Sequence, residues 1–157
     1  MTDCAEPAIL HRKVQLRFAA RADHLVFARL VIAGIAVAEG LPARIVSDLK
    51  LAVTEACTNA VEHAYASVDG ADAAGGAAPS VYVSYEIGPD VVVVEVEDHG
   101  GGFDLSAARA ATSTPNDRSG GMGLSIIETL VDDLSITTGG CGTRMTFAKR
   151  RDASACE

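Results

Sequence analysis

Aromatic side chains are scarce in this chain of 157 residues, since they make up 4% of it and tryptophan is missing altogether. Aliphatic side chains must therefore fill any core, and a hydrophobic content of 48% supplies enough of them for a globular fold. The length suits one domain with a sizeable core. We expect a single domain over residues 1–157.

An excess of positive charge is also missing. The chain has 13 Lys and Arg against 21 Asp and Glu, which gives a formal net charge of −8. Proteins that bind DNA, RNA or anionic membranes through phosphate groups concentrate basic side chains on one surface. The composition therefore argues against direct binding to nucleic acid or to a membrane.

Long hydrophobic runs and paired cysteines are absent as well. The longest largely apolar run, residues 30–38, is too short to span a bilayer, and the N-terminus lacks the pattern of a signal peptide. The four cysteines form no CxxC pair, and they stand at positions 4, 57, 141 and 156. Scattered cysteines of this kind are typical of reduced thiols, so we expect a cytoplasmic protein.

Residues 43–65 predict an amphipathic helix that carries a polar face of special interest. Its buried stripe is expected to consist of Leu49, Ala52, Val53, Ala56, Ala60 and Ala64. Glu55, Asn59 and His63 follow one another at intervals of four residues and so share a second face. A carboxylate can accept a proton, and an amide oxygen suits Mg²⁺. Taken alone, however, this helix is more simply interpreted as having a solvated polar face.

The remaining periodicities predict the fold class. Strands are expected at residues 11–19, 81–87, 91–98, 134–138 and 143–149, and further helices at 25–38 and 124–132. In the helix at 25–38 the apolar face is expected to be Phe27, Leu30, Val31, Ile35 and Ala38. Strands in succession with tight turns favour antiparallel pairing. We expect an α+β, two-layer sandwich with a mixed, mostly antiparallel sheet and helices on one face.

The strand at 91–98 ends in a carboxylate. Asp98 continues the phase of alternate valines on the buried face, whereas Glu95 and Glu97 point the other way and are expected on a solvated face. A buried carboxylate needs a hydrogen-bond donor. That donor is either a backbone amide or the amino group of a bound base.

Two glycine-rich stretches follow. Residues 99–103, HGGGF, allow the close approach of a planar or phosphorylated ligand. Gly121 and Gly123 open the helix at 124–132, and the free amides and positive dipole end of such a helix suit a phosphate.

Three motifs in this order resemble the ATP-binding fold of the GHKL superfamily, which gyrase, a class of heat-shock chaperones, histidine kinases and MutL share. They are ExxxN from Glu55, DxGxGF from Asp98 and GxG from Gly121. The similarity covers residues 14–149 and implies a Bergerat-type ATP-binding fold with its core there. Within the superfamily, TEACTNAVEHAY and GMGLSIIETLVDDL make the chain most similar to bacterial anti-sigma-factor serine/threonine kinases.

The resemblance implies a role for each matching residue. Glu55 resembles the base that activates the acceptor serine, Asn59 would hold Mg²⁺ against the phosphates of ATP, and Asp98 would accept a hydrogen bond from the adenine amino group. The other implied nucleotide-binding positions are Gly100 and Gly102 at the base, Arg118, Gly121 and Gly123 at the phosphates, and Thr143 beside Asp98. Arg29 matches a position on the family's partner-binding surface.

The implied function is ATP- and Mg²⁺-dependent phosphorylation of a serine or threonine on an anti-sigma-factor antagonist. The same protein would sequester a sigma factor, as a homodimer, in transcription regulation of a stress response. Two alternatives stay open, a non-catalytic nucleotide-gated binding module and a GHKL ATPase. Glu55 favours chemistry over binding alone. The chain departs from the family pattern at Gly120, an extra glycine, and at His99, where a small or polar residue is common.

Overall fold

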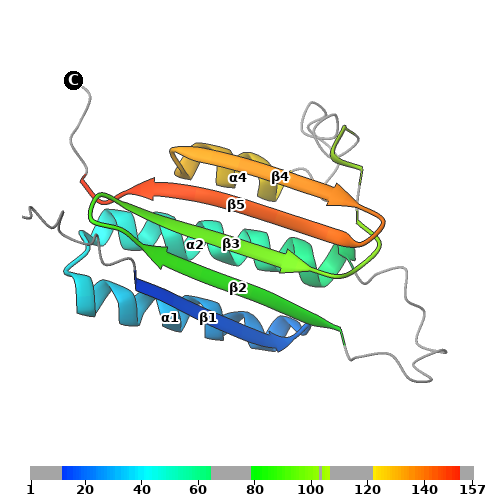
Figure 1. Cartoon of the computed structure of the whole chain (residues 1–157), viewed down its shortest axis with the longest axis horizontal. Coiled ribbons are helices and arrows are strands. Elements are labelled where there is room, and N and C mark those ends of the chain that lie inside the picture. The colour runs from blue at the N-terminus through cyan, green and yellow to red at the C-terminus, as the bar shows by residue number, and fades with distance from the viewer. Residues whose placement is uncertain (1–11, 65–78, 103, 107–121, 153–157) are drawn as a thin grey trace, which may run out of the picture.

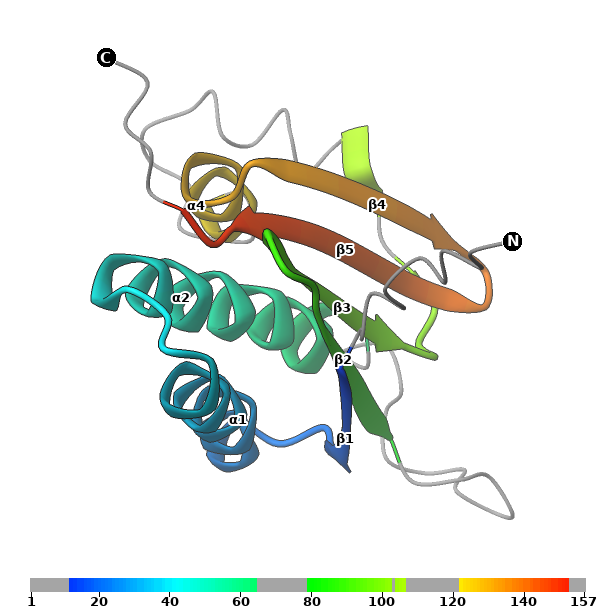
Figure 2. The same cartoon turned by 60° about the vertical axis from the view of Figure 1, so that its left-hand side comes forward.

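The computed structural model describes residues 12–64, 79–102, 104–106 and 122–152 (Figure 1). The strands are β1 (Arg12–Ala19), β2 (Ser80–Ile87), β3 (Val91–Asp98), β4 (Asp133–Gly139) and β5 (Gly142–Arg150). The helices are η1 (Ala22–His24), α1 (Leu25–Glu39), α2 (Ala43–Asn59), the π-helical turn η2 (Ala60–Ala64) and α4 (Met122–Leu130). Figure 2 shows α1, α2 and α4 together on one face of the sheet.

The five described strands form one sheet in the order β1-β2-β3-β5-β4, and every neighbouring pair is antiparallel. A tight turn joins β2 to β3, where the Gly88 N–H donates to the Val91 carbonyl at 2.9 Å. From β3 the chain passes through α4 to the edge strand β4 and returns as β5 between them. The predicted α+β, two-layer arrangement is confirmed, and its described strands include no parallel pair.

Helix α2 is the centre of the core, because it packs against both α1 and α4 and lies over the sheet. Its predicted stripe is buried from Leu49 to Ala60, and Ile45 and Cys57 join it. The inward faces of the central strands complete the core with Val81, Val83, Tyr85, Ile87, Val92, Val94, Val96, Met145 and Phe147. The period-two and helical patterns thus identify most of the buried side chains correctly.

The buried face of α1 differs from the prediction. Ala28, Ile32 and Ile35 are buried, whereas Phe27 is 44% and Leu30 is 59% exposed. The reason is that α1 is apolar nearly all round, so periodicity alone does not identify the side that packs. Across the described residues, no helix combines the length and the apolar character needed to cross a membrane.

Helix α4 is fixed to the rest of the core by Lys149 of β5. Its ammonium lies 3.0 Å from the carboxylate of Asp48 on α2 and donates to the carbonyl of Leu130, at the end of α4, at 2.6 Å. The Lys149 and Asp48 side chains are only 12% and 16% exposed. Leu124 and Ile127 bury the inner face of the same helix. One lysine therefore links the end of α4 to α2.

We predict that Lys149→Met lowers the free energy of unfolding by about 1–3 kcal/mol, because it leaves the Asp48 carboxylate poorly solvated and unpaired. Denaturant unfolding followed by circular dichroism measures this loss. Lys13→Met, at an exposed position on β1, is the control and should stay within about 0.5 kcal/mol of the parent. A Lys149→Met protein as stable as that control would show that the pair does not anchor α4.

Candidate functional site

Glu55, Asn59 and Gly123 lie together where α4 begins beside α2. The approach is so close that a β-carbon on Gly123 would stand 2.9 Å from Oε2 of Glu55 and 3.4 Å from Oδ1 of Asn59. Only glycine fits there without displacing these side chains. The structure therefore brings together three of the predicted site residues. Gly121 and Arg118 lie outside the described residues.

The end of α2 is irregular at this point. The predicted helix continues to residue 65, but α2 ends at Asn59 and the chain goes on as the π-helical turn η2. Such turns are rare and frequently occur at functional sites. Because η2 packs against β3 and β5, it brings the end of α2 to the strands that carry Asp98 and Thr143. The side chain of His63, in this turn, is not among those described.

Asp98 provides a buried carboxylate at the end of β3. It is 5% exposed and stands in register between Val81 of β2 and Thr143 of β5. Burial raises the pKa of Asp98, although hydrogen bonds from the backbone of Gly100 and Thr143 partly oppose this rise. The Gly100 N–H donates to Oδ1 of Asp98 at 3.0 Å. An acidic acceptor with so little water around it is suited to a ligand that donates a hydrogen bond.

Thr143 lies directly opposite Asp98 and is 7% exposed. Its hydroxyl is 3.3 Å from that of Thr138 on β4. The buried hydroxyl of Thr143, the partly buried hydroxyl of Thr138 and the buried carboxylate form a polar end to an otherwise apolar face. The resemblance to the family implies that Thr143 assists Asp98 at this position.

Two glycines let the turn between β4 and β5 approach the end of β3. Gly142, with φ +119°, is so close that a β-carbon would lie 2.0 Å from the Asp98 carbonyl oxygen and 2.8 Å from the His99 α-carbon. Gly102, with φ +73°, would bring one to 2.4 Å from the Gly139 carbonyl oxygen. Gly102 is among the site residues predicted from the sequence, whereas Gly142 is not, because its signal in the sequence is no more than a place in a glycine-rich turn.

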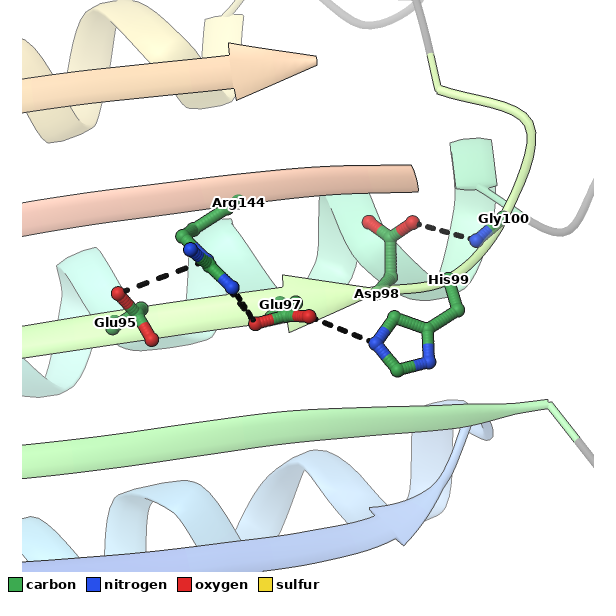
Figure 3. A network of polar contacts seen from close by, with 6 residues as sticks. All are labelled: Glu95, Glu97, Asp98, His99, Gly100 and Arg144. Atoms are coloured by element: carbon green, nitrogen blue, oxygen red, sulfur yellow. Dashed lines mark hydrogen bonds and ion pairs between the residues drawn. The ribbon is translucent and has the colours of Figure 1, made fainter. Parts of the chain in front are cut away.

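A network of polar side chains lies on the outer face of the sheet, opposite the face on which Asp98 is buried (Figure 3). Arg144 donates to Glu97 from Nη2 at 2.8 Å and from Nε at 3.1 Å, and Nε lies 3.8 Å from Glu95. His99 Nε2 is 2.8 Å from the other oxygen of Glu97. Partial burial acts to raise the pKa of Glu97, but the hydrogen bonds from Arg144 and His99 outweigh it and lower the pKa below its usual value. Glu95 and Glu97, which are expected on a solvated face, therefore have charged or polar partners there.

Comparison with known proteins places these residues in a family context. The family described as histidine kinase-like ATPase domain matches residues 18–149. A serine-protein kinase RsbW from Listeria monocytogenes serotype 4a is 34% identical over 136 residues, which covers 82% of each chain. An RsbW from Bacillus pumilus is 32% identical over 130 residues, with 78% of this chain and 76% of the relative covered.

Solved structures show the same fold. The crystal structure of the RsbU and RsbW domains of Rv1364c from Mycobacterium tuberculosis matches with a TM-score of 0.62 at 22% identity. That match covers 88% of this chain and 32% of the other. The histidine kinase domain of a blue-light activated histidine kinase from Erythrobacter litoralis matches with a TM-score of 0.52 at 20% identity, over 85% of this chain and 62% of that one.

We predict that Gly123→Ala disables the site without unfolding the protein. The added methyl group displaces the ends of the Glu55 and Asn59 side chains, which are flexible and partly exposed. Magnesium-dependent nucleotide binding should weaken about 10- to 100-fold, the range for disturbing groups that orient a metal ligand. Calorimetric titration measures this effect.

Gly34→Ala on α1 is the matched control, because apart from its chain neighbours and the backbone of its own helix no atom lies within 4 Å of a β-carbon placed there. It should leave nucleotide affinity unchanged and stabilise the helix by about 0.5–1 kcal/mol. Equal nucleotide affinity in the two alanine variants would contradict the placement of the site at Gly123.

Proposed function

The chain belongs to the histidine kinase-like ATPase domain family, with the RsbW serine-protein kinases among its relatives, and we propose that it is itself a serine/threonine-protein kinase. It uses ATP and Mg²⁺, phosphorylates an anti-sigma-factor antagonist and sequesters a sigma factor. The observation that carries this proposal is the position of the Glu55 carboxylate against Gly123, at the opening of α4. A carboxylate beside a helix terminus that binds the γ-phosphate is placed to take the proton of the hydroxyl that attacks it.

The described residues suit adenine at one end of the site. A carboxylate accepts hydrogen bonds, so Asp98 matches the exocyclic amino group of adenine, and its low exposure strengthens the interaction. The Thr143 hydroxyl and the backbone at Gly100 and Gly102 line the same end. These features support ATP as the phosphoryl donor.

The other end suits phosphates with a magnesium ion. In the part of the chain that is described, no cluster of three or more His, Cys, Asp or Glu side chains fits a metal. Mg²⁺ is commonly held by few protein groups together with substrate phosphates, and the Asn59 amide oxygen is such a ligand. When bound, the ion neutralises charge that develops on the phosphate oxygens. Arg118 and Gly121 are assigned to the phosphates by resemblance alone.

Glu55 acts as the base of the transfer. The acceptor hydroxyl oxygen attacks the γ-phosphorus of ATP and forms the new O–P bond. The bond from that phosphorus to the β–γ bridging oxygen breaks, ADP leaves, and the hydroxyl proton passes to Glu55. The protein mainly positions the reactants, which agrees with a site of so few catalytic side chains.

Helix α1 is the proposed partner-binding surface. Val26, Phe27, Leu30 and Val37 are exposed on it by between 44% and 87%, and Arg29 is exposed on the same helix. Exposed apolar groups gathered on one element are typical of protein interaction sites. We propose that residues 1–157 work as one ATPase domain in a cytoplasmic homodimer, and that the sigma factor and the antagonist dock on α1.

Asp98→Asn is predicted to separate binding from stability. Nucleotide binding should lose about 1–3 kcal/mol, since a neutral amide is a weaker acceptor than a carboxylate. The raised pKa of Asp98 means that the folded protein binds a proton there more tightly than the unfolded chain does. The ionised group thus opposes folding as the pH rises through that pKa, so at neutral pH the variant should be at least as stable as the parent.

Calorimetry with ADP and thermal unfolding of the free protein test the two halves of this prediction. Unchanged nucleotide affinity would contradict the role of Asp98. A marked loss of stability in the nucleotide-free variant would contradict the raised pKa of Asp98 in the parent protein.

Glu55→Gln is predicted to keep ATP and partner binding while phosphorylation falls about 10²–10⁴-fold, the usual contribution of a general base. The substitution preserves shape and hydrogen bonding but removes the basic oxygen. A phosphotransfer assay on the antagonist, run beside a pull-down of the sigma factor, measures both properties. If Glu55→Gln phosphorylates as fast as the parent, the base is another group. If the parent binds the sigma factor but phosphorylates nothing, the protein is a nucleotide-gated binding module.

A further inference from the structure

His99 lies between Asp98 and Gly100 in the chain, but its side chain points away from the proposed adenine site. Asp98 lies on the buried face of β3, and His99 follows it with its ring on the outer face beside Glu97 (Figure 3). The ring therefore does not contact a base held by Asp98. Any effect of this side chain on the ligand has to act through the backbone.

Contacts from two strands hold the His99 ring. Its Nε2 lies 2.8 Å from Oε1 of Glu97, while Oε2 of Glu97 accepts from Arg144 at 2.8 Å. The ring also stacks on Tyr82 of β2, with ring centroids 4.8 Å apart and an angle of 30° between the planes. The guanidinium of Arg17 in turn lies 5.3 Å from the centre of the Tyr82 ring. Each contact is weak alone, but together they restrict the ring.

The backbone of His99 is restricted from another direction as well. A β-carbon on Gly142 would lie 2.8 Å from the His99 α-carbon, so the turn between β4 and β5 presses directly on this residue. His99 is also the middle residue of the turn that the Gly100 N–H closes onto Oδ1 of Asp98 at 3.0 Å. Its backbone angles therefore decide whether that hydrogen bond forms and how the Asp98 carboxylate is oriented.

We propose that His99 is a positioning residue for nucleotide recognition, and that Glu97, Tyr82 and Arg144 act through it to fix the Asp98–Gly100 turn. The inference rests on the proposed function, because it takes adenine as the ligand of Asp98. Since the network lies at the base end and not at Glu55, it governs nucleotide affinity and base selectivity rather than the rate of transfer.

The test uses the full-length protein and compares His99→Ala, His99→Gln and Glu97→Ala with the parent. Gln15→Ala is the matched control, because Gln15 is an exposed polar side chain on the same outer face of the sheet, on β1, and is not one of the described contacts of His99, Glu97 or Arg144. Calorimetry gives the affinities for ADP and GDP with Mg²⁺. A phosphotransfer assay at saturating ATP gives kcat, and thermal unfolding verifies that each variant is folded.

His99→Ala and Glu97→Ala should bind ADP about 3- to 10-fold more weakly, the effect of loosening one hydrogen bond to a charged group. Their preference for ADP over GDP should fall in parallel, whereas kcat should stay within about twofold of the parent. His99→Gln, which keeps a donor for Glu97, should bind more tightly than His99→Ala. Gln15→Ala should match the parent in every measurement. A merely structural role would lower stability without changing base preference.

Folded His99 and Glu97 variants with the ADP affinity and base preference of the parent would overturn the inference. So would a loss of kcat at unchanged affinity, since that would place the role of His99 at the phosphate end. A parent that binds no adenine nucleotide would instead overturn the proposed function itself, and the two failures are therefore distinguishable.

Discussion

The close packing of α4 on α2 is the constraint on which the candidate site depends. At one end of α4, Lys149 joins its last carbonyl to Asp48 of α2. At the other end, the missing side chain of Gly123 allows the helix to touch Glu55 and Asn59. Moving α4 outward by the width of one methyl group would separate its first turn from the Glu55 carboxylate and the Asn59 amide. The site is thus a consequence of how the core packs.

Asp98 shows where stability and the proposed function oppose each other. Burial of Asp98 raises its pKa, so the ionised form, which is the form proposed to bind adenine, opposes folding. The valines of β3 and the stripe of α2 supply the apolar burial that offsets this cost. A polar group retained in a core at such a cost is typical of a functional site.

Much of this arrangement is predictable from the sequence, because it follows from local periodicity. The alternation along β3 places Asp98 on the buried face, and the spacing of four residues places Glu55 and Asn59 on one side of α2. The buried face of α1 is not predictable in this way, since its apolar residues surround the whole helix. The π-helical turn after Asn59 has no sequence signal that we recognise. The assignments of Arg118 and Gly121 stay predictions, because both residues lie outside the described part of the chain.

Contacts between distant segments are the other part that the sequence did not reveal. The close approach of Gly142 to the end of β3 and the pairing of Glu97 with Arg144 both depend on the register between β3 and β5.

The most direct measurement of the central claim is a crystal structure with Mg²⁺ and a non-hydrolysable ATP analogue. We expect the adenine amino group on Asp98, the metal on Asn59 and the γ-phosphate beside Glu55 and Gly123. Adenine bound away from Asp98, or phosphates directed away from Glu55, would contradict the proposed site.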